Sequence, residues 1–483
     1  MLQQLSKMPV FHFFEQISAI PRASSAEEGI AAFLCDFARS RGLWFRTDAM
    51  HNVLIKKDAT AGYENEPTVM LQGHMDMVCV KTTDSTHDFS KDPIRLICTG
   101  DWLHADNTSL GADNGIAVAM MLAVLDDASL QHGALECLFT VQEETGLSGA
   151  AACDYSDCCA ELLFNLDSED EGIATVSCAG GVRCDIQQPL TRTACDGMTG
   201  FSLIADGFAG GHSGMDIALG RVNAIRTLGC LLTHLRRQFA VRLVQMDGGE
   251  MDNAIPCSCR VQITVPQADQ GAFITAAQQM ILQRYSSFSK ADAAAAITLS
   301  PSSVSMQPLT QQDTDTALTM ITSVPCGVLR RMQEDTAQIE TSANLGIVRT
   351  ATDKMVFTVS VRSCVEERRA DVQAVLCQLA RTLGMEISFR GEYPGWAYDA
   401  HSKSRNRYCN AYFSLFGQKP RVESIHAGLE CGVIKSHMPR IDPISFGPDL
   451  KDVHTPFEQL CISSVCRTYR LLQEMLSKKD VTI

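Results

Sequence analysis

Apolar runs of strand length alternate with helical stretches over residues 1–185. The run at 114–127 predicts a helix that follows the turn Asp113-Asn114-Gly115. Strands interleaved with helices are typical of an α/β domain with a mixed, largely parallel sheet between helices. The shorter apolar runs, which predict strands, lie at 51–57, 68–74, 135–144 and 160–170.

The stretch 186–392 has a different pattern and is predicted to be an inserted α+β domain. The order strand, polar turn, helix, strand occurs twice in it, at 260–300 and at 355–391. This weak internal repeat indicates two similar lobes. Residues 393–483 are predicted to return to the first domain, which therefore consists of 1–185 and 393–483.

The N-terminal stretch predicts two short helices separated at Ile20-Pro21. Ser24 or Ser25 is expected to cap the second helix, with Glu27 or Glu28 in its first turn. The stretch has no basic flank and no small-residue cleavage site, so it does not resemble a secretory signal, and a cytoplasmic location is expected.

Composition narrows the range of partners. The chain has 483 residues and a formal net charge of −15, without a Lys/Arg run. Nucleic acid and anionic membranes both require a basic surface, so neither is an expected partner. No apolar run approaches the ~18 residues of a membrane-spanning helix. The 20 cysteines lie mostly in apolar runs and predict reduced, buried thiols in place of disulfides.

Polar residues follow the predicted strands where ligands of α/β sheets collect. His74 and Asp76, two residues apart, can lie on one side of the strand end, where a carboxylate can orient a metal-binding imidazole. Glu143 and Glu144 end another strand, and two adjacent acids suit one metal ligand and one general base. Asp167 ends a third strand.

Each of these residues also has an ordinary structural interpretation. His74 and Asp76 can be an incidental polar strand end, and the acids can be solvated. Asp113 precedes a helix and can be its N-cap, although Gly111 and Gly115 flank it. His454 can be a loop histidine. Together, however, two histidines and three carboxylates suit a pair of divalent cations that share a bridging carboxylate.

Five segments of the chain form a recognisable set: "GHMDMV", "GADNG", "EETGLSGA", "NLDSED" and "HTPFE". They resemble the dizinc metallopeptidase family that includes aminoacyl-histidine dipeptidases, acetylornithine deacetylase and glutamate carboxypeptidases. Further segments are most similar to the bacterial cytosolic aminoacyl-histidine dipeptidases. These are "HAGLECG", "GGHSGMDI" and "MDNAIP". The five segments quoted first occur in the family's order.

The resemblance implies a role for each residue of the cluster. Asp113 would bridge two metals, and the Asp113–Asn114 peptide bond would be cis. Asp76 would orient one of the ligands, and Glu143 would be the general base for an attacking water held between the metals. The remaining ligands would be His74 and Asp167 on one metal, and Glu144 and His454 on the other.

The resemblance also implies that the insertion is a lid that contacts the substrate. His212 would reach the oxyanion, Asn253 would contact the substrate, and Arg362 would bind the carboxylate of a dipeptide. Glu430 is expected to hold the substrate's N-terminal ammonium. Two divalent cations per chain are implied, with Zn²⁺ expected and Co²⁺ or Mn²⁺ as alternatives.

These expectations describe a metal-dependent dipeptidase that hydrolyses unblocked dipeptides, including Xaa-His dipeptides. An N-acyl amino-acid deacylase with the same metal centre is one alternative. A non-catalytic binding protein on this scaffold is another, and redox regulation through Cys79 is a third. Monomer and homodimer stay open, because a two-lobed lid can replace the second subunit that completes the site in some relatives.

Overall fold

The computed structural model describes residues 5–194, 196–285, 288–304, 306–333 and 335–479. It divides into two compact units. Unit 1 comprises residues 1–178, 396–424 and 429–483, and unit 2 comprises 179–395 and 425–428. The mixed α/β fold class is confirmed, and the short segment 425–428 groups with unit 2. Among the described residues, no helix is both long and apolar enough to cross a bilayer.

Unit 1 is built on an eight-stranded sheet with the order β1-β2-β6-β3-β7-β21-β8-β20. The four central strands, β6, β3, β7 and β21, run parallel, and the neighbours on either side are antiparallel. The strands are β1 Trp44–Thr47, β2 Val53–Lys57, β3 Val69–His74, β6 Leu135–Thr140, β7 Leu162–Asn165, β8 Ile173–Cys178, β20 Arg421–Ile425 and β21 Asp442–Ser445.

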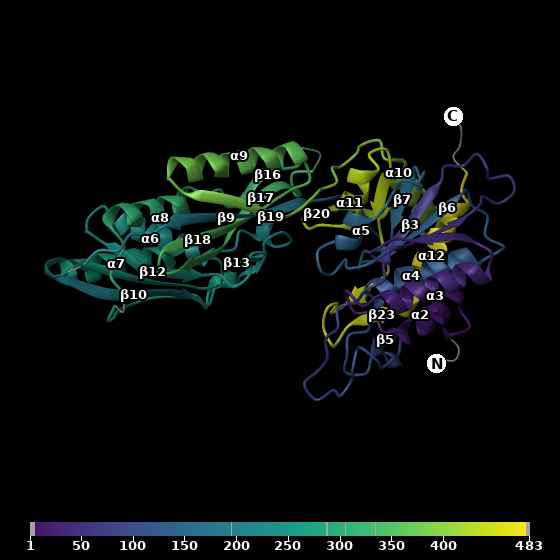
Figure 1. Ribbon diagram of the computed structural model, residues 1–483, viewed down its shortest axis with the longest axis horizontal. Coiled ribbons are helices and arrows are strands. Elements are labelled where there is room, and N and C mark those ends of the chain that lie inside the picture. The colour runs from purple at the N-terminus through teal and green to yellow at the C-terminus, as the bar shows by residue number, and fades with distance from the viewer. Residues whose placement is uncertain (1–4, 195, 286–287, 305, 334, 480–483) are drawn as a thin grey trace. The chain divides into compact units, whose positions relative to one another are not determined.

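Helices cover both faces of this sheet (Figure 1). Helix α4 packs against β3 and α2, whereas α5 and α11 pack together elsewhere on unit 1. Every residue of α4 except Asp113 and Asp126 is buried, as expected for a helix that is apolar all round. The helices are α2 Pro9–Ser18, α3 Glu28–Ser40, α4 Ala112–Asp126, α5 Ser148–Ala152, α10 Lys403–Phe416, α11 Glu430–His437 and α12 Ile462–Ser477.

A small four-stranded sheet completes unit 1, in the order β22-β23-β5-β4. Its strands are β4 Leu96–Thr99, β5 Trp102–Ala105, β22 Leu450–Lys451 and β23 Gln459–Cys461.

Unit 2 has one large sheet in the order β15-β10-β14-β12-β17-β18-β9-β19, with β16 also paired to β17. The predicted repeat is present: β14-α7-β15 places two strands on either side of β10, and β18-α9-β19 does the same around β9. The two halves join where β12 pairs with β17, so the predicted lobes share a single sheet.

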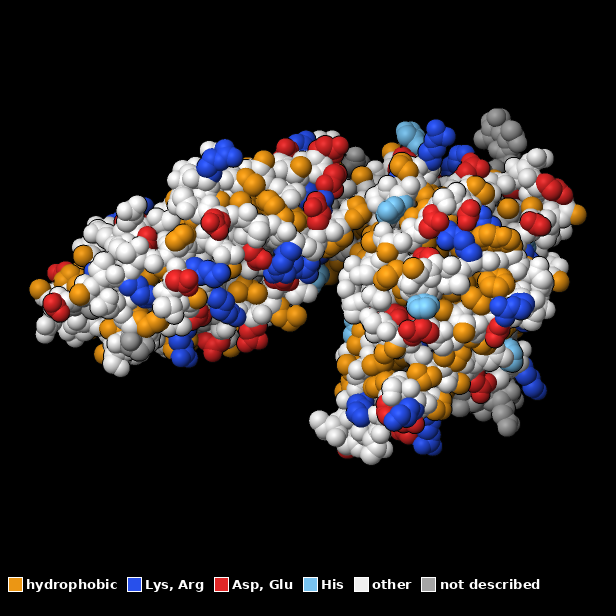
Figure 2. Space-filling view, viewed as in Figure 1, with side chains coloured by type: hydrophobic (Ala, Val, Ile, Leu, Met, Phe, Trp, Pro, Cys, Tyr) orange, Lys and Arg blue, Asp and Glu red, His pale blue; other side chains and the backbone are white. Residues whose placement is uncertain are grey.

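Helices α6 to α9 pack on this sheet (Figure 1), and Figure 2 shows acidic and basic side chains interspersed on the visible surface of each unit. The elements of unit 2 are β9 Gly180–Pro189, β10 Met198–Asp206, β11 Gly211–His212, η1 Ile217–Leu219, α6 Ala224–Leu235, β12 Arg242–Gly248, β13 Ala254–Ile255, β14 Cys259–Pro266, η2 Gln267–Asp269, α7 Gln270–Tyr285, η3 Lys290–Asp292, β15 Ala296–Pro301, α8 Gln311–Ser323, β16 Gly327–Arg331, β17 Ile339–Thr350, β18 Lys354–Ser363, α9 Glu366–Thr382 and β19 Glu386–Tyr393.

The predicted cap of the second helix was wrong. Helix α3 begins at Glu28, and neither Ser24 nor Ser25 caps it. The hydroxyl of Ser24 instead donates a hydrogen bond to Asp76 Oδ2 at 2.8 Å. Ser24 therefore binds the side chain of Asp76, just after β3, and does not cap α3.

Candidate metal centre

His74 and Asp76 lie side by side where β3 ends. Both side chains are buried, and His74 Nδ1 is 3.3 Å from Asp76 Oδ1. The Asp76 carboxylate also accepts hydrogen bonds from the backbone N–H groups of Glu143, at 3.1 Å, and Glu144, at 3.3 Å. Asp76 thus holds both the imidazole of His74 and the turn that carries the two glutamates. A carboxylate beside a metal-binding histidine typically orients the imidazole ring in this way.

The two carboxylate oxygens of Asp113 face two different histidines. Asp113 Oδ1 is 3.2 Å from His74 Nε2, and Asp113 Oδ2 is 3.0 Å from His454 Nε2. Asp167 Oδ1 lies 3.6 Å from His74 Nε2, and Glu144 Oε1 lies 3.0 Å from His454 Nε2. Asp113 therefore belongs to two groups of donor atoms, one around each histidine.

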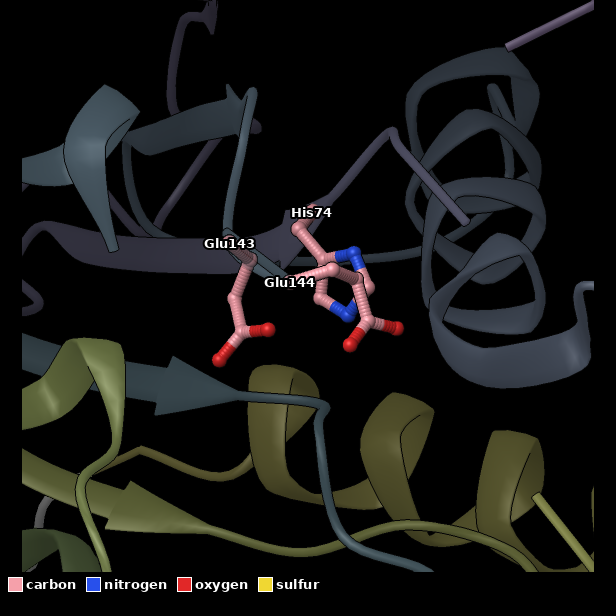
Figure 3. A group of neighbouring side chains, drawn as sticks. All are labelled: His74, Glu143 and Glu144. Atoms are coloured by element: carbon pink, nitrogen blue, oxygen red, sulfur yellow. The ribbon is translucent and has the colours of Figure 1, made fainter. Parts of the chain in front are cut away.

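Three groups of side chains bring their donor atoms within 4.8 Å of one another, a spacing at which they could hold a metal ion. Figure 3 shows one of them, in which the carboxylates of Glu143 and Glu144 lie near the ring of His74. Mixed imidazole and carboxylate donors suit Zn²⁺, Co²⁺ or Mn²⁺. The groups are His74 with Glu143 and Glu144, His74 with Asp113 and Asp167, and Asp113 with Glu144 and His454.

The charges of the cluster favour a cation. Burial raises the pKa of Asp167 well above its ordinary value, and the neighbouring carboxylates of Asp113 and Glu143 raise it further. Burial also raises the pKa of Glu143 to about 8. Burial alone would lower the pKa of His74, but the surrounding carboxylates raise it well above its ordinary value. Carboxylates so crowded are stabilised by positive charge, so the residues present fit divalent cations.

Glu458 and Arg22 hold the loop that carries Asp113. Glu458 is buried, and its carboxylate accepts hydrogen bonds from four consecutive backbone N–H groups at 110–113, over 2.7–3.1 Å. Arg22 is also buried and donates to the carbonyl oxygens of Gly111, at 2.5 Å, and Met75, at 2.9 Å. The loop is thus held in two ways. The Glu458 carboxyl group binds its amide groups, and the Arg22 guanidinium binds the carbonyl oxygen of Gly111.

Gly111 is required for this arrangement. It has a φ of 68°, and a Cβ atom on it would lie 2.5 Å from Arg22 Nη2. The following Asp113–Asn114 peptide bond is cis, as expected. The Asn114 side chain donates to the carbonyl oxygen of Leu166 at 2.9 Å, which ties the loop to the segment just before Asp167.

Glu430 does not lie where a substrate ammonium could reach it. It is fully buried at the start of α11. Gln72 Nε2, on β3, donates to its Oε2 at 2.5 Å, and Thr140 Oγ1, on β6, donates at 2.8 Å. Burial raises the pKa of Glu430 to about 8. The side chain links α11 to β3 and β6, and its full burial does not support the expected contact with a substrate ammonium.

In unit 2, His212 is held in a defined tautomer. Its Nδ1 accepts a hydrogen bond from the backbone N–H of Met215 at 3.0 Å, which leaves the proton of the neutral ring on Nε2. Burial and the charge of Arg362 lower the pKa of His212, which favours the neutral ring. Asn253 is adjacent, because its carbonyl oxygen accepts from Ser213 N at 2.7 Å.

Arg362 lies on β18, buried, and donates to Tyr393 Oη at 2.7 Å. Its partner across the sheet is Ser342, whose Oγ lies 2.7 Å from His426 Nε2. The structure therefore brings the predicted Arg362 together with His426 and Tyr393, which the sequence interpretation did not assign.

Four residues that support the predicted sites were missed, and sequence signals were available for three of them. Glu458 ends the "HTPFE" segment that contains His454, and His426 begins "HAGLECG". Arg22 lies beside the helix break at Pro21. Tyr393 lies outside the segments that carry the resemblance. Its contact with Arg362 depends on strand pairing that a single sequence does not show.

The comparisons with known proteins establish the family. Residues 70–478 match the peptidase family M20/M25/M40. The cytosol non-specific dipeptidase of Escherichia coli (strain K12) is 35% identical over 480 residues, which cover 99% of this chain and 99% of that protein. The chain belongs to the peptidase family M20/M25/M40, and the resemblance inferred from its motifs is confirmed.

Solved structures extend the likeness to the whole fold. The aminoacylhistidine dipeptidase from Vibrio alginolyticus is 34% identical, with a TM-score of 0.94 over 100% of this chain and 99% of that chain. The aminopeptidase PepT from Bacillus cereus shares the fold, with a TM-score of 0.57 and 14% identity over 98% of each chain.

Proposed function

We propose that the protein is a dinuclear metallo-dipeptidase of the cytosol. The observation that carries the proposal is the position of Asp113, whose two oxygens face two separate groups of donor atoms. The likeness to a cytosol non-specific dipeptidase and to an aminoacylhistidine dipeptidase supports the choice of dipeptides as substrates. Unblocked dipeptides, including Xaa-His dipeptides, are the substrates proposed.

The proposed ligands fall into two groups around the bridging carboxylate of Asp113. One group contains His74 and Asp167, and the other contains Glu144 and His454. When bound, a pair of divalent cations lowers the pKa of a water molecule and polarises the scissile carbonyl. Zn²⁺ is the cation proposed, with Co²⁺ or Mn²⁺ as alternatives.

Glu143 is the proposed general base. Its backbone is held by Asp76, and its carboxylate lies within reach of the same donor group as His74. A carboxylate whose pKa is raised by burial takes a proton from water more readily than an ordinary one. The same group then returns the proton to the amine that leaves.

The residues of unit 2 are proposed to contact the substrate. The Nε2–H of His212 is a hydrogen-bond donor suited to an oxyanion. Arg362 keeps guanidinium N–H groups beyond the one that it gives to Tyr393, and a guanidinium binds a carboxylate through two parallel hydrogen bonds. Asn253 is proposed as a further polar contact.

Hydrolysis of carnosine and of N-acetylcarnosine, with metal content measured on the same sample, tests the proposal. Cleavage of carnosine alone, with about two metals per chain lost to a chelator together with activity, is expected. Cleavage of the acetylated compound alone would make the protein a deacylase with the same metal centre. A metal-free protein that cleaves neither compound would contradict the proposal entirely.

Arg362→Ala tests the substrate role in unit 2. We expect the KM for dipeptides to rise at least about tenfold, because one charge-assisted pair contributes roughly 1.5–3 kcal/mol. Arg260→Ala, at an exposed position on β14, is the matched control. An unchanged KM in Arg362→Ala would remove this residue from the substrate site.

A further inference from the structure

A layer of buried polar side chains crosses the centre of the main sheet of unit 1. Gln72 on β3, Thr140 on β6 and Asn165 on β7 lie on three neighbouring parallel strands. Parallel strands that are covered on both faces usually carry apolar side chains, because a buried polar group costs free energy unless it is hydrogen-bonded. All three residues are 0% exposed, as is Glu430, which begins α11. The core thus contains four polar residues where apolar residues are the rule.

Hydrogen bonds connect all four side chains. Asn165 Nδ2 donates to Gln72 Oε1 at 2.6 Å, and Gln72 Nε2 donates to Thr140 Oγ1 at 3.1 Å. Glu430 Oε2 accepts from both Gln72 Nε2, at 2.5 Å, and Thr140 Oγ1, at 2.8 Å. Glu430 therefore joins α11 to β3 and β6 through a single oxygen atom, and Gln72 extends the connection to β7. Hydrogen-bonded networks of this kind make a core rigid.

Each strand of this layer leads directly to the proposed metal centre. Gln72 lies two residues before His74, and Asn165 lies two residues before Asp167. Thr140 pairs with His74 in the register of the sheet, and it precedes the turn that carries the two adjacent glutamates. A shift of one strand against another at this layer would therefore move the donor atoms of one ligand relative to those of the next.

The surroundings of Glu430 favour a carboxyl group without charge. The partners of its side chain among the described residues are an amide and a hydroxyl, which both donate to Oε2, whereas Oε1 is buried without a partner in that part of the chain. An ionised carboxylate would leave a charge unpaired in the core, so burial raises the pKa of Glu430 to about 8. At pH 7 the site therefore favours the neutral acid, with its proton on Oε1.

We infer that Glu430 is a positioning residue for the metal ligands and that it acts as a neutral acid. It fixes the ends of β3 and β6 from α11, and thereby the separation of His74 from the two glutamates that follow β6. The neutral form makes this connection without adding a negative charge near carboxylates that are already crowded. The inference rests on the proposed metal centre and gives Glu430 no contact with substrate.

Metal affinity, measured by competition with a chelator, tests the inference in two variants. Glu430→Gln keeps the shape and an oxygen acceptor without charge, and its metal affinity should stay within about threefold of wild type. Glu430→Leu removes the acceptor at similar volume, and its affinity should fall about 10–100-fold, as for other groups that orient a ligand. The absorption spectrum of bound Co²⁺, which depends on coordination geometry, should change in Glu430→Leu only.

The control is Leu34→Ala, at a buried position of α3. It should lower the stability of the same unit and leave metal affinity unchanged. Equal affinity in Glu430→Leu and wild type would show that Glu430 does not position the ligands. An equal loss in Glu430→Gln and Glu430→Leu would show that the charge is required, and would overturn the neutral role. If Glu430→Leu does not fold, Thr140→Val removes one donor to Glu430 and should lower metal affinity at least about threefold.

Hydrogen exchange of the metal-free protein separates this inference from the proposed function. The backbone N–H of Met75 donates to the carbonyl oxygen of Thr140 at 2.7 Å. Relative to the amides of α3, it should exchange at least about threefold faster in Glu430→Leu than in Glu430→Gln, because the strand ends open locally. A wild-type protein that binds no divalent cation would contradict the proposed function alone. Equal exchange at Met75 in the two variants would contradict the inference alone.

Discussion

Glu143 and Glu144 are adjacent in the chain, but their side chains have different surroundings. Glu144 Oε1 lies 3.0 Å from His454, whereas Glu143 is half-buried and desolvation raises its pKa to about 8. We expect Glu143→Gln to lower kcat by about 10³-fold, because general-base catalysis contributes ~10²–10⁴-fold, while metal content is retained. Glu144→Gln should instead lose metal. Steady-state kinetics and metal analysis measure both effects, and metal loss in Glu143→Gln would reverse the two roles.

Glu458 does not belong to the proposed metal ligands, but it holds the loop that carries Asp113 through the amides at 110–113. Replacing it with Gln removes the charge from an acceptor that four backbone N–H groups share. We expect metal affinity to fall about 10–100-fold, as is usual when a group that positions a ligand is changed, and the free energy of unfolding to fall by about 1–3 kcal/mol. Competition with a chelator and denaturant titration measure these effects.

The matched control for Glu458 is Glu28→Gln, at an exposed position in the first turn of α3. It should leave metal affinity unchanged. If Glu458→Gln loses stability but binds metal as tightly as the control, the residue supports the fold only and does not position Asp113.

At the scale of elements, the period and spacing of apolar residues predicted where helices and strands lie. They did not predict which strands pair with each other. The apolar run that ends at His74 predicted β3, and the repeated pattern predicted the helices and strands around β9 and β10. Alternation along one strand does not reveal which strand lies next to it. The union of the two lobes through β12 and β17 was therefore not foreseen. The partner of Ser24 was missed for a similar reason, because a serine near a helix start is ordinarily its cap.

The junction between β3 and α4 shows how closely the elements near the site approach. A Cβ atom on Gly73 would lie 2.4 Å from Asn114 Oδ1 and 2.7 Å from Ala117 Cβ. We expect Gly73→Ala to reduce the free energy of unfolding by about 1–3 kcal/mol through overpacking. Metal binding should also weaken, since the substitution displaces Asn114 beside Asp113.

Gly271→Ala, in α7, is the control for Gly73→Ala, because a Cβ there meets no atom within 4 Å. It should be neutral or stabilising, as Ala favours a helix by about 1 kcal/mol over Gly. Denaturant unfolding measures both variants, and equal stabilities would show that α4 can shift away from β3 without cost.

At the scale of the whole molecule, each unit buries titratable groups of its own. Unit 1 buries acids around Asp113, whereas unit 2 buries the imidazole of His426 beside Ser342. Burial, followed by the charge of Arg362, lowers the pKa of His426 to about 3. The stability of the two units should therefore depend differently on pH. The effect of His426 is easier to interpret, because unit 2 holds none of the proposed metal ligands.

The sign of the His426 effect follows from proton uptake. The unfolded chain binds a proton at His426 below a pKa of about 6.5, and the folded unit does not until pH approaches 3. Stability should therefore fall as pH decreases from 6.5, by about 2 kcal/mol at pH 5. Hydrogen exchange in β17 and β18, corrected for intrinsic rates, measures this loss. His426→Gln should remove most of it, while His234→Gln, exposed on α6, should retain it. An equal decline in wild type and His426→Gln would mean that another group governs the acid sensitivity of unit 2.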